Sequence, residues 1–90
     1  MKNLMQLSIE DNQISTLKGF PQLPHLMEIY LSNNCLEEIR EIMNLKKLSR
    51  LIILDLSGNT LSQDPHFRIY SIFHTKKLKV LNGIPIESSE

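Results

Sequence analysis

Few side chains in this 90-residue chain could carry catalysis or hold a metal, and they are scattered. They comprise three histidines, His25, His66 and His74, and the single cysteine, Cys35. His66 and His74 are eight positions apart, whereas two histidines that hold a metal from one helix face are typically about four apart. No nucleophile–histidine arrangement follows from the spacing, and the three glycines form no phosphate-binding loop. We therefore expect no enzyme activity, catalytic residue, metal or cofactor.

Net charge and cysteine content narrow the classes of function and the cellular settings that remain. Ten basic residues balance ten acidic ones, which argues against nonspecific binding to nucleic acid or anionic membranes. Two basic runs, Lys46-Lys47 and Lys76-Lys77-x-Lys79, lack the interleaved aromatic residues of a base-stacking surface. A single cysteine cannot form an internal disulfide, and no segment resembles a signal peptide or a membrane span. We expect a cytoplasmic, or at least intracellular, protein that binds neither nucleic acid nor membranes; the nucleus and cytoskeletal structures also fit.

A repeated leucine pattern is the most informative feature of the chain. The segment 51–61 reads Leu-Ile-Ile-Leu-Asp-Leu-Ser-Gly-Asn-Thr-Leu. Leu54 and Leu56 flank Asp55, so a short strand points both leucines inward and Asp55 outward. The same template, Leu-x-x-Leu-x-Leu-x-x-Asn-x-Leu, occurs twice upstream. Its upstream positions are Leu4, Leu7, Ile9, Asn12 and Ile14, and then Leu26, Ile29, Leu31, Asn34 and Leu36.

The asparagines of the template, Asn12, Asn34 and Asn59, are spaced by 22 and 25 residues. We expect all three to be structural, lying inside turns with their amides bonded to the backbone. Between the templates an apolar residue recurs at every third position, a period that suits 3₁₀ turns or a loose helix. These positions are Ile14, Leu17, Phe20, Leu23 and Leu26, and then Leu36, Ile39, Ile42, Leu45, Leu48 and Leu51.

The pattern changes after Leu61. Asp64-Pro65 predicts a helix start, with a side-chain cap followed by proline at the first helical position. The segment 78–84 predicts a last short strand. The expected wide apolar face of the helix is Phe67, Ile69, Tyr70, Ile72 and Phe73. We expect repeats over about 4–25, 26–50 and 51–64, a C-terminal cap over 65–86 and a frayed tail over 87–90.

These segments resemble the short intracellular class of leucine-rich repeat proteins, with about 22 residues per repeat. The last third resembles the C-terminal cap of that class, although Phe67-Arg68 replaces its usual Tyr-Arg and Asn82 replaces the aspartate of its Leu-Asp-Gly. The resemblance implies an α/β fold: a right-handed solenoid with a short parallel concave sheet, 3₁₀ or helical convex arms and a helix–strand cap.

The family binds partners mostly through the concave sheet, which we call the strand face. The resemblance therefore implies a non-catalytic protein–protein interaction module that binds on this face. Tyr30 is the aromatic residue best suited to anchor a partner, and Asp55 beside it suits a basic group. The outward positions, given by the period of two, are Gln6, Ser8, Glu10, Glu28, Tyr30, Ser32, Ile53, Asp55, Ser57 and Asn82. Of these, Ser8, Tyr30, Asp55 and Asn82 are expected to form one column. Plain solvent exposure of these side chains is the competing interpretation.

Charge is unevenly distributed over the expected faces. Glu10, Asp11, Glu28 and Asp55 fall on the strand face, with no lysine or arginine among its outward positions. Eight of the ten basic residues fall on the second arm and the cap. An acidic strand face favours a basic or helical segment of another protein as the partner.

The first repeat has no cap before Leu4, although repeat arrays need polar ends. Met1–Asn3 is too short to cover it. We therefore expect the C-terminal part of a longer leucine-rich repeat protein, or a shortened form of one, able to self-associate through the uncapped N-terminal edge. The alternative is a purely structural capping segment of a larger solenoid, with no partner of its own.

Overall fold

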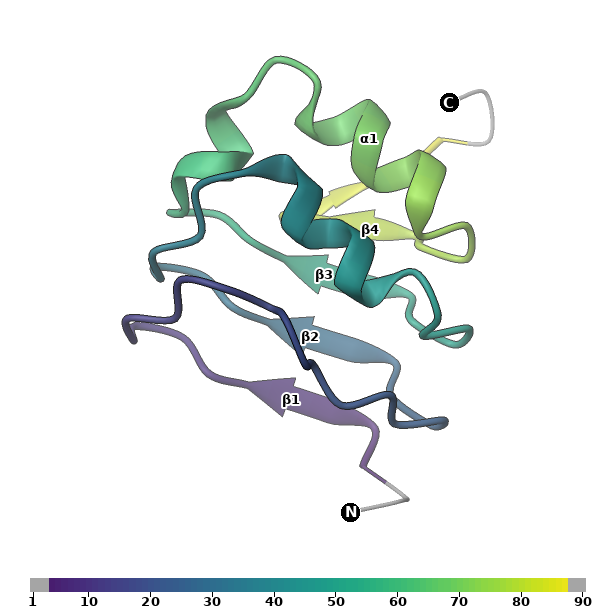
Figure 1. Ribbon diagram of the computed structural model, residues 1–90. Coiled ribbons are helices and arrows are strands. Elements are labelled where there is room, and N and C mark those ends of the chain that lie inside the picture. Colours follow the sequence, from purple (N-terminus) through teal and green to yellow (C-terminus); the bar gives the residue numbers. More distant parts are fainter. Residues whose placement is uncertain (1–3, 88–90) are drawn as a thin grey trace.

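The computed structural model describes residues 4–87. The expectations for Met1–Asn3 and for most of the tail therefore lie outside the described residues. Five short strands form one sheet in chain order, the first four parallel and the last antiparallel (Figure 1). The strands are β1 (Gln6–Ser8), β2 (Glu28–Tyr30), β3 (Ile53–Asp55), β4 (Val80–Leu81) and β5 (Ile84–Pro85). The expected solenoid with a parallel sheet is confirmed.

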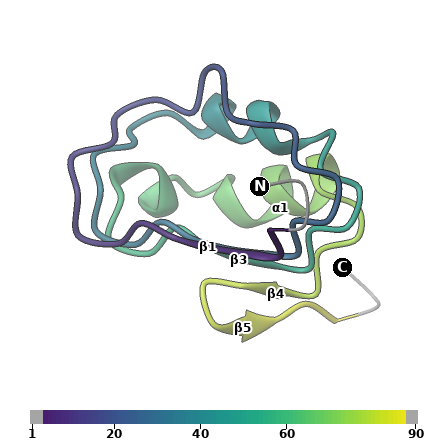
Figure 2. The ribbon, with the colours of Figure 1, turned by 90° about the horizontal axis from the view of Figure 1, so that it is seen from below.

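Return arms run along the side opposite the strands (Figure 2). The second arm contains the seven-residue 3₁₀ helix η1 (Ile39–Leu45), and the third begins with η2 (Thr60–Gln63). The first arm forms no helix, only isolated turns. Pro21 and Pro24 interrupt it and donate no backbone hydrogen bond, so a continuous 3₁₀ ladder cannot form there. The prediction of 3₁₀ turns or a loose helix is thus confirmed as a 3₁₀ helix in the second arm, and in the first arm only as two single turns, closed by Phe20 N on Leu17 O and Leu26 N on Leu23 O.

The inward leucines form one interior. Strand pairing aligns Leu7 with Ile29, Ile29 with Leu54, and Leu54 with Leu81. The last three are at most 1% exposed, whereas Leu7 is only partly buried because β1 is the edge strand. Each fully buried leucine or isoleucine stabilises the fold by about 1.5–3 kcal/mol relative to an exposed one. Stacking of successive coils is therefore what makes this short chain fold.

Two of the three template asparagines lie buried and connect neighbouring coils. The Asn59 amide donates to the carbonyls of Leu31 and Leu56 at 2.9 and 3.0 Å, and its Oδ1 accepts from Leu36 N at 3.1 Å. Asn34 repeats this one coil earlier, reaching Ile9 O and Ile14 N. Asn12 differs.

The expectation that Asn12 is enclosed in its turn is wrong. Its side chain is exposed and bonds only locally among residues 4–87, to the carbonyls of Ile9 and Glu10. The physical reason is position in the stack. Asn34 and Asn59 are covered by the coil before their own, and none of the described residues forms such a coil beside Asn12.

The cap helix α1 (Phe67–His74) begins two residues later than predicted. Asp64 Oδ1 accepts a hydrogen bond from His66 N at 2.8 Å, so this carboxylate caps a turn that precedes the helix. The predicted last strand over 78–84 exists, but as the two-residue β4 followed by a second strand. Asn82 and Gly83, with φ of 50° and 78°, form a tight turn that sends β5 back along β4. Asn-Gly is a strong hairpin signal that our strand prediction overlooked.

Only part of the predicted apolar face of α1 packs: Phe67 lies in the core and Tyr70 packs against it, partly buried. Phe67 and Ser71 are buried, whereas Ile69 and Phe73 are 74% and 63% exposed. Ile69 lies about 200° around the helix from Phe67, so both cannot face η1 and η2, against which α1 packs at the end of the stack opposite β1 (Figure 1). The small Ser71 side chain fills the buried side instead.

Candidate partner-binding surface

Backbone register brings the predicted outward positions into two rows. Ser8 pairs with Tyr30, and Tyr30 with Asp55, which confirms three members of the expected column. The second row runs through Gln6, Glu28, Ile53 and Val80. The leucine or isoleucine between the two rows points into the core, so both rows lie on the strand face.

Tyr30 is held by its neighbour rather than standing free in solvent. It is partly buried, and its hydroxyl donates a 2.6 Å hydrogen bond to Glu28 Oε1. This bond raises the pKa of Tyr30 above 10.0, and desolvation and the negative charges of Glu28, Asp55 and Glu10 raise it further. Three carboxylates therefore act on one phenol, and the centre of the strand face is an acidic environment around an oriented aromatic ring.

The raised pKa of Tyr30 gives the first testable expectation. Substituting Glu28→Gln removes the charged acceptor, so the pKa of Tyr30 is expected to fall towards 10.0 in an ultraviolet titration. Because the folded state holds this proton more tightly than the unfolded state, this group contributes stability below pH 10 that is lost as pH rises through the folded-state pKa. Tyr30→Phe in the same titration distinguishes the absorbance change of Tyr30 from that of Tyr70. A pKa that Glu28→Gln leaves unchanged contradicts the assignment.

Other predicted positions use their polar groups within the chain. Asp55 Oδ1 accepts from both the backbone N and the hydroxyl of Ser57, at 3.0 and 2.6 Å, so these two side chains hold each other. Asn82 Oδ1 accepts from Leu56 N at 2.7 Å. The column therefore ends at Asp55. The Asn82 side chain instead joins the cap hairpin to Leu56, the residue after β3, so its expected place in the column is wrong.

The remaining predicted positions differ in exposure. Gln6, Ser8 and Glu10 are exposed, while Ser32 and Ile53 are partly buried. Two further side chains, which the alternation of the strands also places on this side, bond to each other: Asn33 Nδ2 donates to Asp11 Oδ1 at 2.9 Å and extends the polar surface beyond the strand ends. Asp11 and Asn33 both have positive φ, near 58°.

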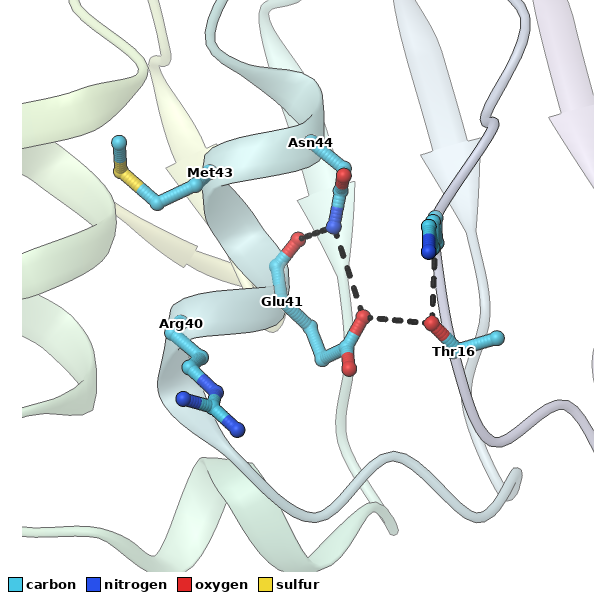
Figure 3. Close-up of a pocket in the computed structure, with 6 residues that line it drawn as sticks. Thr16, Arg40, Glu41, Met43 and Asn44 are labelled. Carbon is cyan, nitrogen blue, oxygen red and sulfur yellow. Dashed lines mark hydrogen bonds between the residues drawn. The ribbon is translucent and has the colours of Figure 1, made fainter.

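A hollow of about 470 Å³ lies on the arm side, where the first arm contacts η1 (Figure 3). Several of the polar side chains that line it bond within the chain. At its centre Glu41 Oε1 accepts from the Thr16 hydroxyl at 3.2 Å and from Leu17 N at 2.8 Å. Asn44 donates to the backbone carbonyl of Glu41 at 3.0 Å. The carboxylate is thus used in joining the first arm to η1.

Residues 4–87 contain no cluster of three or more histidine, cysteine or acidic side chains placed to hold a metal ion. Within the same residues no helix has the length and hydrophobicity needed to cross a membrane.

Comparisons with known proteins identify related chains. The human U2 small nuclear ribonucleoprotein A′ is 31% identical over 92 aligned positions, which cover 100% of this chain and 36% of that protein. The alpha subunit of mouse geranylgeranyl transferase type-2 is 35% identical over 68 residues, covering 76% of this chain and 12% of the subunit. This chain thus spans about a third or less of these relatives.

Solved structures match the fold. The leucine-rich repeat domain of Mex67 from Chaetomium thermophilum superposes with a TM-score of 0.84 at 25% identity, covering 93% of this chain and 59% of that one. A chain of the Drosophila melanogaster SNF/U2A′ complex gives a TM-score of 0.71 at 20% identity, covering 98% and 64%, and supports the fold alone. A family model described as leucine-rich repeat matches residues 1–89. The chain belongs to the leucine-rich repeat family.

Proposed function

We propose that this chain is a non-catalytic protein–protein interaction module, and that its partner binds on the strand face. The observation that carries the proposal is the arrangement around Tyr30, whose ring is oriented by Glu28 and flanked in register by Ser8 and Asp55. An aromatic side chain fixed before binding loses little entropy on contact, which is typical of interface anchors. The human relative U2A′ is 31% identical to this chain, and a U2A′ is found in a complex with SNF, which supports protein binding by analogy.

The charge of the strand face indicates the chemistry of the partner. Glu10, Glu28 and Asp55 all act on the Tyr30 hydroxyl, and no lysine or arginine occupies the outward positions of β1, β2 or β3. A basic segment, extended or helical, therefore gains attraction across the whole face and associates faster. We infer an intracellular setting for this interaction.

Binding to RNA or DNA is tested together with binding to protein. One relative is named as a component of a ribonucleoprotein, and a neutral net charge speaks only against nonspecific binding. The binding experiment therefore includes a nuclease-treated arm, which separates direct capture of protein from capture through RNA or DNA.

The test is affinity capture from cell extract with charge-reversed variants. Glu28→Lys with Asp55→Lys is expected to lose the proteins retained by the wild type, and Tyr30→Ala to weaken their retention, because all three changes alter the strand face. Lys46→Glu with Lys47→Glu is the matched control, since both lysines are exposed outside the strands. Equal retention by the strand-face variant and the wild type, after nuclease treatment, would place the binding site elsewhere.

The alternative is a purely structural segment that ends a larger solenoid. The packing of α1 against η1 and η2 favours it, because this helix covers the end of the stack opposite β1. A wild-type chain that retains no protein in the capture experiment, while remaining folded, would support this alternative.

A further inference from the structure

Among residues 4–87, nothing covers the β1 end of the stack, which is apolar. Leu7, Ile9 and Ile14 pack against the core yet stay only partly buried. With Leu17 and Phe20 they line a hollow of about 340 Å³. Figure 2 looks onto this end, with β1 and the first arm framing it. An apolar end that leaves several large side chains half in water gains stability when another surface covers it.

The backbone of β1 offers unused hydrogen-bonding groups at this end. Ile9 N donates to Tyr30 O at 2.9 Å, and Met5 O accepts from Glu28 N at 3.0 Å, so the odd-numbered positions face β2. Backbone groups alternate in direction along a strand. Those of Gln6 and Ser8 therefore point to the open edge, where no strand of residues 4–87 pairs with them.

The two edges of the sheet are protected differently. The edge strand β5 contains Pro85, which lacks a donor, and is only two residues long. By contrast, the segment 5–9 reads Met-Gln-Leu-Ser-Ile and has neither a charge nor a proline. Edge strands without these features pair readily with another strand. Pairing of β1 with β5 of another molecule is thus disfavoured, and pairing of β1 with β1 is not.

We propose that two copies of this chain associate through β1, antiparallel, about a twofold axis at Leu7. In this register Gln6 lies opposite Ser8 of the second copy, and the two residues exchange both backbone hydrogen bonds. Leu7 meets Leu7 of the second copy on the core side, where the two apolar ends cover each other. The contact is the same from both sides, so it closes at a dimer and joins the two sheets into one.

The register can be tested with charges because Gln6 and Ser8 are both exposed. In the proposed dimer, Gln6→Lys with Ser8→Lys places like charges directly opposite each other, twice. Gln6→Lys with Ser8→Glu places opposite charges there instead. Sedimentation equilibrium over a wide micromolar range is expected to show a wild-type monomer–dimer equilibrium. The first variant is expected to dimerise about tenfold more weakly, and the second at least as well as the wild type.

The proposal would be overturned by a folded wild type that stays monomeric throughout, by equal association of the two charge variants, or by an open series of oligomers. A monomeric wild type would leave the β1 end to another occupant, such as a preceding coil of a longer chain. Ile69→Ser with Phe73→Ser removes the two large apolar side chains that α1 exposes at the opposite end, and is expected to leave the dimer intact. Loss of the dimer in that variant would assign the contact to α1 instead. Circular dichroism of each variant verifies the fold.

Discussion

Replacing Asn59 with leucine is expected to lower the free energy of unfolding by about 3 kcal/mol, because a buried backbone group left without a partner costs about 1–3 kcal/mol and each further hydrogen bond lost costs about 0.5–1.5 kcal/mol. The substitution leaves the N–H of Leu36 without a partner and removes one of the two amide donors to the carbonyl of Leu31, which keeps its bond from Asn34. Leu31 and Leu36 belong to the preceding coil, and at 1% exposure Asn59 leaves no room for water to replace its amide. Urea denaturation followed by circular dichroism measures the loss.

The matched control is the same substitution in the first coil. Asn12 is exposed and bonds only to carbonyls of its own turn, 2.9 and 3.3 Å away. Water can satisfy those carbonyls, so Asn12→Leu is expected to cost less than about 1 kcal/mol. Asn34→Leu, with its bonds to Ile9 O and Ile14 N, is expected to behave like Asn59→Leu. Equal losses at Asn12 and Asn59 would mean that the template asparagine acts only within its own turn.

Asn12 and Asn59 also mark how far sequence alone predicts this fold. Their identical template predicts the same strand and turn in each coil, and the structure has both. What the template does not contain is the neighbour. Whether an asparagine or leucine is buried depends on the coil stacked against it, so Asn12 and Leu7 are exposed or half-exposed while Asn59 and Leu54 are buried. The periodicity of the sequence predicts which way a side chain points, and the stacking of neighbouring coils determines whether that side chain is buried.

The cap shows a different limit. An apolar face over most of α1 was predicted from residue type, but the helix lies against η1 and η2 through Phe67 and Ser71. A helix rests on its support along one stripe, and a small residue in that stripe allows a close approach. Ile69 and Phe73 fall outside the stripe. No local pattern distinguishes these choices, whereas the Asn82-Gly83 turn was readable from the sequence.

The strand face was predictable in position but not in detail. Alternation along the strands predicts which side chains point outward, and the register places Ser8, Tyr30 and Asp55 side by side. The bonds of Tyr30 to Glu28 and of Asp55 to Ser57 depend on rotamers that alternation does not determine. These bonds decide which groups are oriented for a partner, so a structure was needed to define the surface.

Leu54→Ala is expected to lower the free energy of unfolding by about 3–4 kcal/mol, the middle of the range for a buried leucine. Leu54 is fully buried in the middle of the stack, aligned with Ile29 on one side and Leu81 on the other. A cavity there has coils on both sides and cannot collapse. Urea denaturation measures the loss, and a change below about 1 kcal/mol would show that the neighbouring coils close the gap.

Leu7→Ala provides the comparison because Leu7 occupies the same strand position as Leu54 but lies at the open end. In the monomer its loss is expected to be about 1 kcal/mol, since less apolar surface returns to water. If two copies join through β1, Leu7 becomes as enclosed as Leu54, and its substitution then also weakens the dimer. The cost of Leu7→Ala is therefore expected to rise with protein concentration, while that of Leu54→Ala is not. This difference in concentration dependence shows whether a second copy covers the β1 end or whether that end stays exposed to solvent.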